Sequence, residues 1–151
     1  MRRVVLDTGV LVEYIDRKGR FHGLAAAVMG SIISGKLTGV VPHPVLTEAY
    51  YVSARIYRVL GLEDFEKRAK TYVEWLFRHP NIVVEPSGLE LAIEAGKIKM
   101  KYGLALTDCY VLALSKMRAC PAVFRKVERE MEGRLDELRR NFRIVFLEEY
   151  V

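Results

Sequence analysis

Short apolar runs alternate with longer helical segments along this chain, and the alternation constrains the fold more than any other feature. The runs that read as buried strands are RRVVL, LTGVVPH, NIVVEP, CPAVF and FRIVFLEE, and segments with apolar residues at helical spacing separate them. Strands that alternate with helices form a parallel sheet with helices on both faces. We therefore expect an α/β fold, a three-layer sandwich whose central parallel sheet has about five strands.

Helices are expected to cover most of the remaining chain. The segments with helical spacing are 9–15, 21–36, 45–78, 87–102 and 105–118, and a charged helix is expected after the fourth strand. The segment 45–78 is interrupted near Gly61, so two helices are expected there. Ser87 and Glu90 fit a capping box at the start of their helix.

The chain length predicts one domain. A chain of 151 residues with 51% hydrophobic residues can bury a core without disulfide bonds, so residues 1–151 are expected to form a single domain. No apolar run approaches the roughly 20 residues that span a bilayer, and the N-terminus lacks the apolar region of a signal peptide. A soluble, cytoplasmic protein is expected. Cys109 and Cys120 have no histidines at metal-ligand spacing, which favours buried free thiols over a zinc site or a disulfide.

The chain is basic, with 24 Lys and Arg residues against 19 Asp and Glu residues. A net charge of +5 attracts polyanions, nucleic acid among them, although a solvated basic surface explains the same balance. Glu and Arg alternate in the segment FRKVEREMEGRLDELRRNFR, which is typical of an exposed helix with salt bridges.

The stretch VVLDTGVLVEYID places Asp7 directly after the first apolar run. Asp-Thr-Gly after apolar residues is typical of aspartic proteases, where two such loops share one proton. That class is excluded because such a protease is almost all β, whereas this chain is mostly helical. The remaining interpretation is a carboxylate at the carboxyl edge of a parallel sheet, where sites form in open α/β folds.

Two further acids stand in apolar surroundings. Glu48 lies in PHPVLTEAYYV, just inside a helix that follows the second strand, and Asp108 lies near the start of the apolar helix in GLALTDCYVLAL. Acids in first turns are also stabilised by the helix dipole, by about 0.3 to 1 kcal/mol, and that account serves either residue alone. Asp7, Glu48 and Asp108 together follow elements that a doubly wound sheet brings to one edge, and this favours a shared site.

These motifs resemble those of the PIN-domain ribonucleases, in particular the VapC-type toxins of prokaryotic toxin–antitoxin pairs. The resemblance covers nearly the whole chain and rests on VVLDTGVLVEYID, PVLTEAYYV and ALTDCYVLALS. It implies a PIN-like fold in which Asp7, Glu48 and Asp108 hold a divalent metal. It also implies an RNA substrate, a small antitoxin partner and a homodimer. The long apolar segment 45–78, including Trp75, fits packing in the core or against a second subunit better than base stacking.

The fourth acid of the family pattern is missing from its usual place. The family has Thr or Ser, one residue, then Asp after the fourth strand, where this chain has Arg125 and Lys126. The nearest acids are Glu128 and Glu130, and we choose Glu128 because it is nearer the strand end and could point back from a first helical turn. A solvated glutamate in a charged helix is the alternative.

Oxygen ligands without Cys or His favour Mg²⁺ or Mn²⁺ over zinc. Such ions neutralise crowded carboxylates, activate water and stabilise charge in phosphodiester hydrolysis. Thr8 and Thr47 would orient the carboxylates, although helix capping explains both equally well. The predicted function is a metal-dependent ribonuclease, catalysed by Asp7, Glu48, Asp108 and Glu128. The alternatives are a PIN-like binding module that has lost activity and a housekeeping RNA-processing nuclease.

Overall fold

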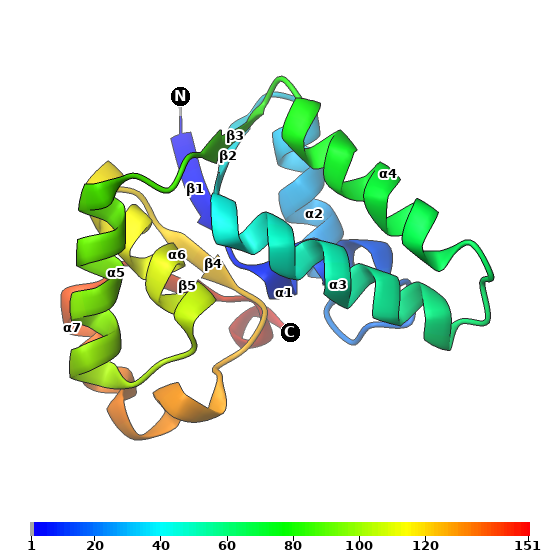
Figure 1. Ribbon diagram of the computed structural model, residues 1–151. Coiled ribbons are helices and arrows are strands. Elements are labelled where there is room, and N and C mark those ends of the chain that lie inside the picture. The colour runs from blue at the N-terminus through cyan, green and yellow to red at the C-terminus, as the bar shows by residue number, and fades with distance from the viewer. Residues whose placement is uncertain (1) are drawn as a thin grey trace.

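A sheet of five parallel strands in the order β3-β2-β1-β4-β5 forms the centre of the molecule (Figure 1). The computed structural model describes residues 2–151. The strands are β1 (Arg2–Leu6), β2 (Leu37–Pro42), β3 (Ile82–Glu85), β4 (Ala122–Phe124) and β5 (Ile144–Phe146). Chain order reverses between β1 and β4, and such a switch point opens a crevice at the carboxyl ends of the strands.

Helices cover both faces of this sheet. Figure 1 shows α5, α6 and α7 on one side of the sheet and α1 to α4 on the other. The α-helices are α1 (Thr8–Ile15), α2 (His22–Ile33), α3 (His43–Val59), α4 (Phe65–Arg78), α5 (Leu89–Tyr102), α6 (Leu106–Arg118) and α7 (Leu135–Asn141). Two short 3-10 helices, η1 (Arg129–Arg134) and η2 (Leu147–Tyr150), complete the described elements. The expected three-layer α/β fold is confirmed.

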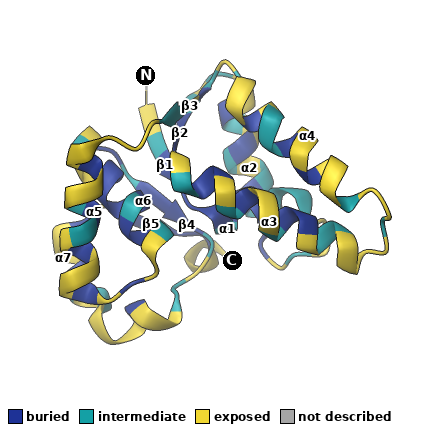
Figure 2. Ribbon diagram, viewed as in Figure 1, coloured by how far each residue is buried: buried dark blue, intermediate teal, exposed yellow. Residues whose placement is uncertain are grey.

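The core lies between the sheet and its helices. Figure 2 shows buried residues along the strands and α6, and exposed residues on the outer faces of α4, α5 and α7. In β1, Arg2 is exposed whereas Val5 and Leu6 are fully buried. The carboxyl end of β1 therefore lies inside the molecule, and it delivers the next residue, Asp7, to a buried position.

The break in segment 45–78 occurs where it is expected. Gly61 has a φ of 81°, a left-handed conformation that glycine adopts without a Cβ penalty, and it separates α3 from α4. The hydroxyl of Tyr72 in α4 donates to the carbonyl of Leu11 in α1 at 2.6 Å. The Trp75 ring stacks against Tyr14 and Tyr72, with centroid separations of 6.4 and 6.1 Å, so it packs within the chain while staying 36% exposed.

Two local expectations differ from the structure. The helix expected from Ser87 begins at Leu89, with Gly88 as the N-cap and no side-chain capping bond, so the capping box is wrong. In place of the charged helix expected after β4, the chain has a short non-helical segment, residues 125–128, followed by η1 and α7. Extended backbone at Glu128, with φ −76° and ψ 155°, delays the helical turn.

Cys109 and Cys120 are both buried and unpaired, as expected. None of the helices in residues 2–151 has the length and apolar character to cross a membrane.

Candidate active site

Asp7 links β1 to α1. It is the N-cap of α1, its carboxylate Oδ2 accepts the Gly9 N–H at 3.1 Å, and only 4% of the residue is exposed. A Cβ at position 9 would lie 3.1 Å from Oδ2 of Asp7 and 2.9 Å from Cβ of Arg125. Gly9 therefore lets the α1 backbone approach the carboxylate closely, which fixes Asp7 at the edge of the sheet.

Glu48 is held by hydroxyl groups from two helices. The Thr107 hydroxyl at the start of α6 lies 3.3 and 3.2 Å from its two carboxylate oxygens, and the Tyr51 hydroxyl donates to Oε2 at 3.3 Å. Thr107 directly precedes Asp108, which is 94% buried since only 6% is exposed. The bond from Thr107 thus fastens α3 to the part of α6 that carries Asp108.

Glu128 comes from the short non-helical segment between β4 and η1. It reaches the site from the N-cap position of η1 and not from a helical turn, because the backbone there is extended. Its charge acts on both Asp7 and Asp108. Glu130 lies two residues further on, is exposed, and reaches the same cavity.

All four predicted acids line one cavity of about 500 Å³ at the carboxyl edge of the sheet. The cavity walls also include apolar residues of α1 and α3, two threonines, and one cation. The lining residues are Asp7, Thr8, Gly9, Val12, Asp16, Glu48, Val52, Ile56, Ala105, Thr107, Asp108, Arg125, Glu128 and Glu130. The sequence prediction that Asp7, Glu48, Asp108 and Glu128 meet is therefore matched by their positions.

The cavity raises the pKa of two of its acids. Burial, with the charges of Glu48 and Glu128, raises the pKa of Asp7 from 3.8 to about 7, although the Gly9 N–H acts in the opposite direction. Burial, with the charges of Asp7, Glu128 and Glu48, raises the pKa of Asp108 from 3.8 to about 9. These carboxyls resist ionising together, which is the condition under which a bound cation stabilises a site.

The donor set fits a hard divalent cation. Asp and Glu offer only oxygen ligands, which suit Mg²⁺ or Mn²⁺. Within residues 2–151, however, no group of three or more His, Cys, Asp or Glu side chains is already arranged around a single point that could hold a metal ion.

Thr8 and Thr47, whose hydroxyls were expected to orient the carboxylates, lie in different environments. Thr8 is buried in the cavity wall, and its Oγ1 has no hydrogen-bond partner among residues 2–151. Thr47 is exposed and lies outside the cavity, so its expected role beside the acids is wrong. Thr107 holds Glu48 instead, and its position next to Asp108 in LTDC was the available signal.

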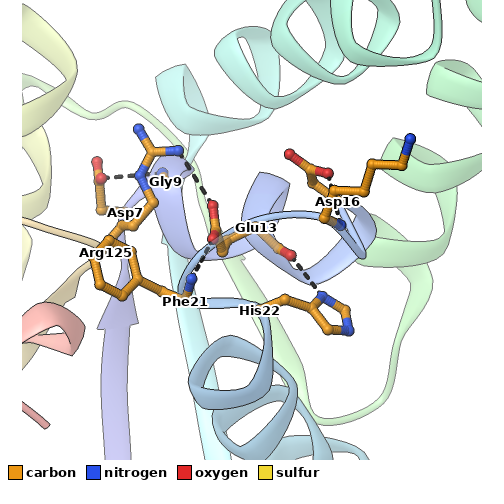
Figure 3. Close-up of polar contacts among 8 residues, drawn as sticks. Asp7, Gly9, Glu13, Asp16, Phe21, His22 and Arg125 are labelled. Atoms are coloured by element: carbon orange, nitrogen blue, oxygen red, sulfur yellow. Dashed lines mark hydrogen bonds and ion pairs between the residues drawn. The ribbon is translucent and has the colours of Figure 1, made fainter. Parts of the chain in front are cut away.

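Arg125 and Glu13 were also missed. Arg125 Nη1 lies 3.3 Å from Glu13 Oε1, and Glu13 Oε2 accepts the Phe21 N–H at 2.7 Å (Figure 3). Figure 3 draws the Arg125 side chain between Asp7 and Glu13. The signal for Glu13 was an acid among the apolar residues of GVLVEYI.

Family comparison agrees with the motifs. A profile of the PIN domain matches residues 4–126, which is more than half of the chain. The chain belongs to the PIN-domain family. A comparison with curated proteins finds no match.

Solved structures of toxins share the PIN-domain fold of this chain. DNA-bound VapBC from Salmonella typhimurium is 16% identical with a TM-score of 0.66, and the match covers 97% of this chain and 99% of that one. VapC20 from Mycobacterium tuberculosis, a toxin that cleaves the sarcin-ricin loop, is 15% identical with a TM-score of 0.63, over 79% and 86%. A toxin–antitoxin complex from Klebsiella pneumoniae is 14% identical with a TM-score of 0.61, over 95% and 97%. At these identities the likeness establishes the fold alone.

Proposed function

We propose that this PIN-domain protein is a Mg²⁺- or Mn²⁺-dependent ribonuclease and the toxin of a VapBC-type toxin–antitoxin pair. The observation that carries the proposal is the cavity that gathers Asp7, Glu48, Asp108 and Glu128, two of them with raised pKa values. Helix capping would explain each acid alone, but it does not explain why all four line one cavity. The toxin part of the proposal is supported by the shared fold of the VapBC structures.

Asp7, Glu48, Asp108 and Glu128 would hold the cation. When bound, it would supply an activated water and charge stabilisation for hydrolysis of a phosphodiester. Asp7 is kept in place by the Gly9 N–H, and Glu48 by Thr107 and Tyr51, so their carboxylates face the cavity without large rearrangement. The net charge of +5 would draw an RNA strand toward the protein.

A homodimer and a small antitoxin complete the proposal. The end of α3 and the outer side of α4 expose Val59, Leu60 and Phe77, by 82%, 47% and 58%. Burying these side chains against a second copy would remove apolar surface from water. Light scattering tests the dimer, and a species that stays at the monomer mass of 17.3 kDa would contradict it.

Cleavage of single-stranded RNA with added Mn²⁺, compared with EDTA, tests the enzyme activity. The matched variant is Asp7→Asn, which keeps the shape of the side chain and removes its charge. We expect metal-dependent cleavage by the wild type and none by the variant. No Mn²⁺ binding, together with no effect of Asp7→Asn, would favour a binding module. Co-expression with the protein encoded by a neighbouring short gene tests the antitoxin.

A further inference from the structure

Arg125 lines the acidic cavity, yet its ion pair points away from the acids. Its only ion pair within residues 2–151 is with Glu13, from Nη1 to Oε1 at 3.3 Å, and none joins it to the four cavity acids. A flexible guanidinium beside carboxylates ordinarily pairs with them. Something therefore holds Arg125 in its observed position.

Glu13 is fixed from three directions. Its carboxylate accepts the Phe21 N–H at 2.7 Å, and its backbone carbonyl accepts a hydrogen bond from His22 Nδ1 at 2.9 Å (Figure 3). A Cβ at Gly19 would lie only 2.3 Å from Glu13 Oε2, so the absence of a side chain there leaves room for the carboxylate. The Glu13 side chain is 5% exposed. It is a rigid anchor that cannot follow Arg125 elsewhere.

Most donors of the Arg125 guanidinium have no partner among residues 2–151. A guanidinium has five N–H groups in a planar fork, and one nitrogen of Arg125 faces Glu13. Nε is buried and has no acceptor among residues 2–151. A buried donor without an acceptor destabilises a fold unless a ligand or water satisfies it. The arginine side chain is 32% exposed, so a ligand in the cavity can reach the fork.

We propose that Arg125 binds a phosphate of the RNA in this cavity, and that Glu13 is the positioning residue that holds the guanidinium away from the metal-binding acids. The inference rests on the proposed function. A phosphate offers two oxygens that match the geometry of the guanidinium fork. The acids of the cavity repel its negative charge, and the positive charge of Arg125 attracts it. Arg125 and Lys126 lie where the family pattern has its Thr-x-Asp motif, so this chain has a cation beside the strand end.

The two residues then have opposite effects on metal binding. Without the charge of Glu13, Arg125 is free to swing toward the acids and compete with a cation. Without Arg125, the acids keep their full charge, so metal affinity is kept or rises. If the ion pair only stabilises the fold, removing Glu13 or Arg125 lowers stability and leaves the affinities for metal and for RNA unchanged.

The experiment uses Arg125→Ala, Arg125→Lys, Glu13→Gln and the double variant Glu13→Gln/Arg125→Ala. Lys126→Ala is the matched control, because Lys126 is exposed, adjacent in sequence and outside the cavity. Mn²⁺ affinity is measured by calorimetry without RNA, RNA affinity by fluorescence anisotropy in EDTA, and KM and kcat with Mn²⁺. Circular dichroism and thermal melting establish that each variant is folded.

Arg125→Ala is expected to weaken RNA binding and raise KM by roughly tenfold or more, the range of a charge-assisted hydrogen bond, without weakening Mn²⁺ binding. Arg125→Lys is expected to recover only part of the loss, because it lacks the fork. Glu13→Gln is expected to weaken Mn²⁺ binding by about tenfold, and the double variant to restore it.

RNA affinity and KM in Arg125→Ala that match Lys126→Ala would overturn the phosphate role. Unchanged Mn²⁺ affinity in Glu13→Gln would overturn the positioning role. A folded wild type that cleaves no RNA in Mn²⁺ would instead overturn the proposed function, and the phosphate role with it. If the wild type cleaves RNA and Arg125→Ala has the same KM, the phosphate role of Arg125 is wrong but the proposed ribonuclease function stands.

Discussion

The Thr107 hydroxyl lies 3.3 Å from Oε1 and 3.2 Å from Oε2 of Glu48, a residue 59 positions earlier in the chain. This contact joins α6 to α3 beside Asp108 and fixes the direction of the Glu48 carboxylate. Groups that orient a metal ligand typically contribute about 10- to 100-fold to metal affinity. Thr107→Val is therefore expected to weaken Mn²⁺ binding by about tenfold in calorimetry, with little change in fold.

Thr107→Ser tests the hydroxyl itself, because it keeps the donor and loses only a methyl group. It is expected to keep most of the Mn²⁺ affinity. Thr47→Val is the matched control, since Thr47 is exposed and outside the cavity. Equal losses in Thr47→Val and Thr107→Val would show that the contact with Glu48 has no special role.

Asp108→Asn is expected to stabilise the metal-free protein. The amide keeps the shape of the side chain and removes a carboxyl whose ionisation is opposed by burial and by the charges of Asp7, Glu128 and Glu48. Two like charges about 4 Å apart repel by about 4 kcal/mol at an effective dielectric near 20, and by less at larger separations. In EDTA the melting temperature should rise by about 2–4 °C per kcal/mol, and the stabilisation by added Mg²⁺ should largely vanish.

Asp136→Asn provides the comparison for this change, because Asp136 is an exposed residue in the first turn of α7. It is expected to leave the Mg²⁺ response intact and to lower stability slightly, as the loss of an acid at a helix N-terminus does. A lower melting temperature with an unchanged Mg²⁺ response in Asp108→Asn would mean that Asp108 only caps α6. The same pattern at Asp7 would end the nuclease proposal.

The stability of the metal-free protein is expected to fall as pH rises. In the fold the pKa of Asp7 is about 7 and that of Asp108 about 9, against 3.8 for an unperturbed aspartate. The folded state thus binds these protons more tightly than the unfolded chain does. Their stabilising contribution is complete below the unfolded pKa and is lost as pH rises through the folded pKa values.

Urea unfolding in EDTA between about pH 5 and pH 9 measures this effect. The double variant Asp7→Asn/Asp108→Asn lacks both titrating groups and should show a flatter pH dependence over the same range. Identical pH dependence in the wild type and the double variant would mean that these carboxyls ionise as freely in the fold as in the unfolded chain.

The strands and most helices were predictable because their patterns are local. Buried parallel strands are continuous apolar runs, and RRVVL and CPAVF stand out for that reason. The segment after β4 was not predictable in the same way. Its alternating charges fit any solvated helix, and they do not indicate that the backbone stays non-helical through Glu128 before η1 begins.

Asp7 and Asp108 were recognisable because a lone acid among apolar residues needs a partner or a function. Thr107 and Arg125 were not, because their roles depend on partners 59 and 112 residues away in the chain. Spacing within one helix or strand holds no information about such contacts. They exist only once the sheet brings α1, α3, α6 and the end of β4 to one edge.

Glu128 and Glu130 are the two candidates for the fourth acid of the site. Glu128 and Glu130 both line the cavity, but only the charge of Glu128 contributes to the raised pKa values of Asp7 and Asp108. Charges that act on one another also act together on a cation placed among them. Glu128→Gln is therefore expected to weaken Mn²⁺ binding and RNA cleavage more than Glu130→Gln.

Calorimetry with Mn²⁺ on the two variants decides the assignment, because each loses one charge from the same short segment. Glu128→Gln should also bring the pKa of Asp108 down toward its ordinary value, since one of the charges that raise it is removed. A greater loss in Glu130→Gln would transfer the role to that residue. Equal and small losses of Mn²⁺ affinity in the two variants would leave Asp7, Glu48 and Asp108 as the metal ligands. Glu128 and Glu130 would then contribute only negative charge near the site.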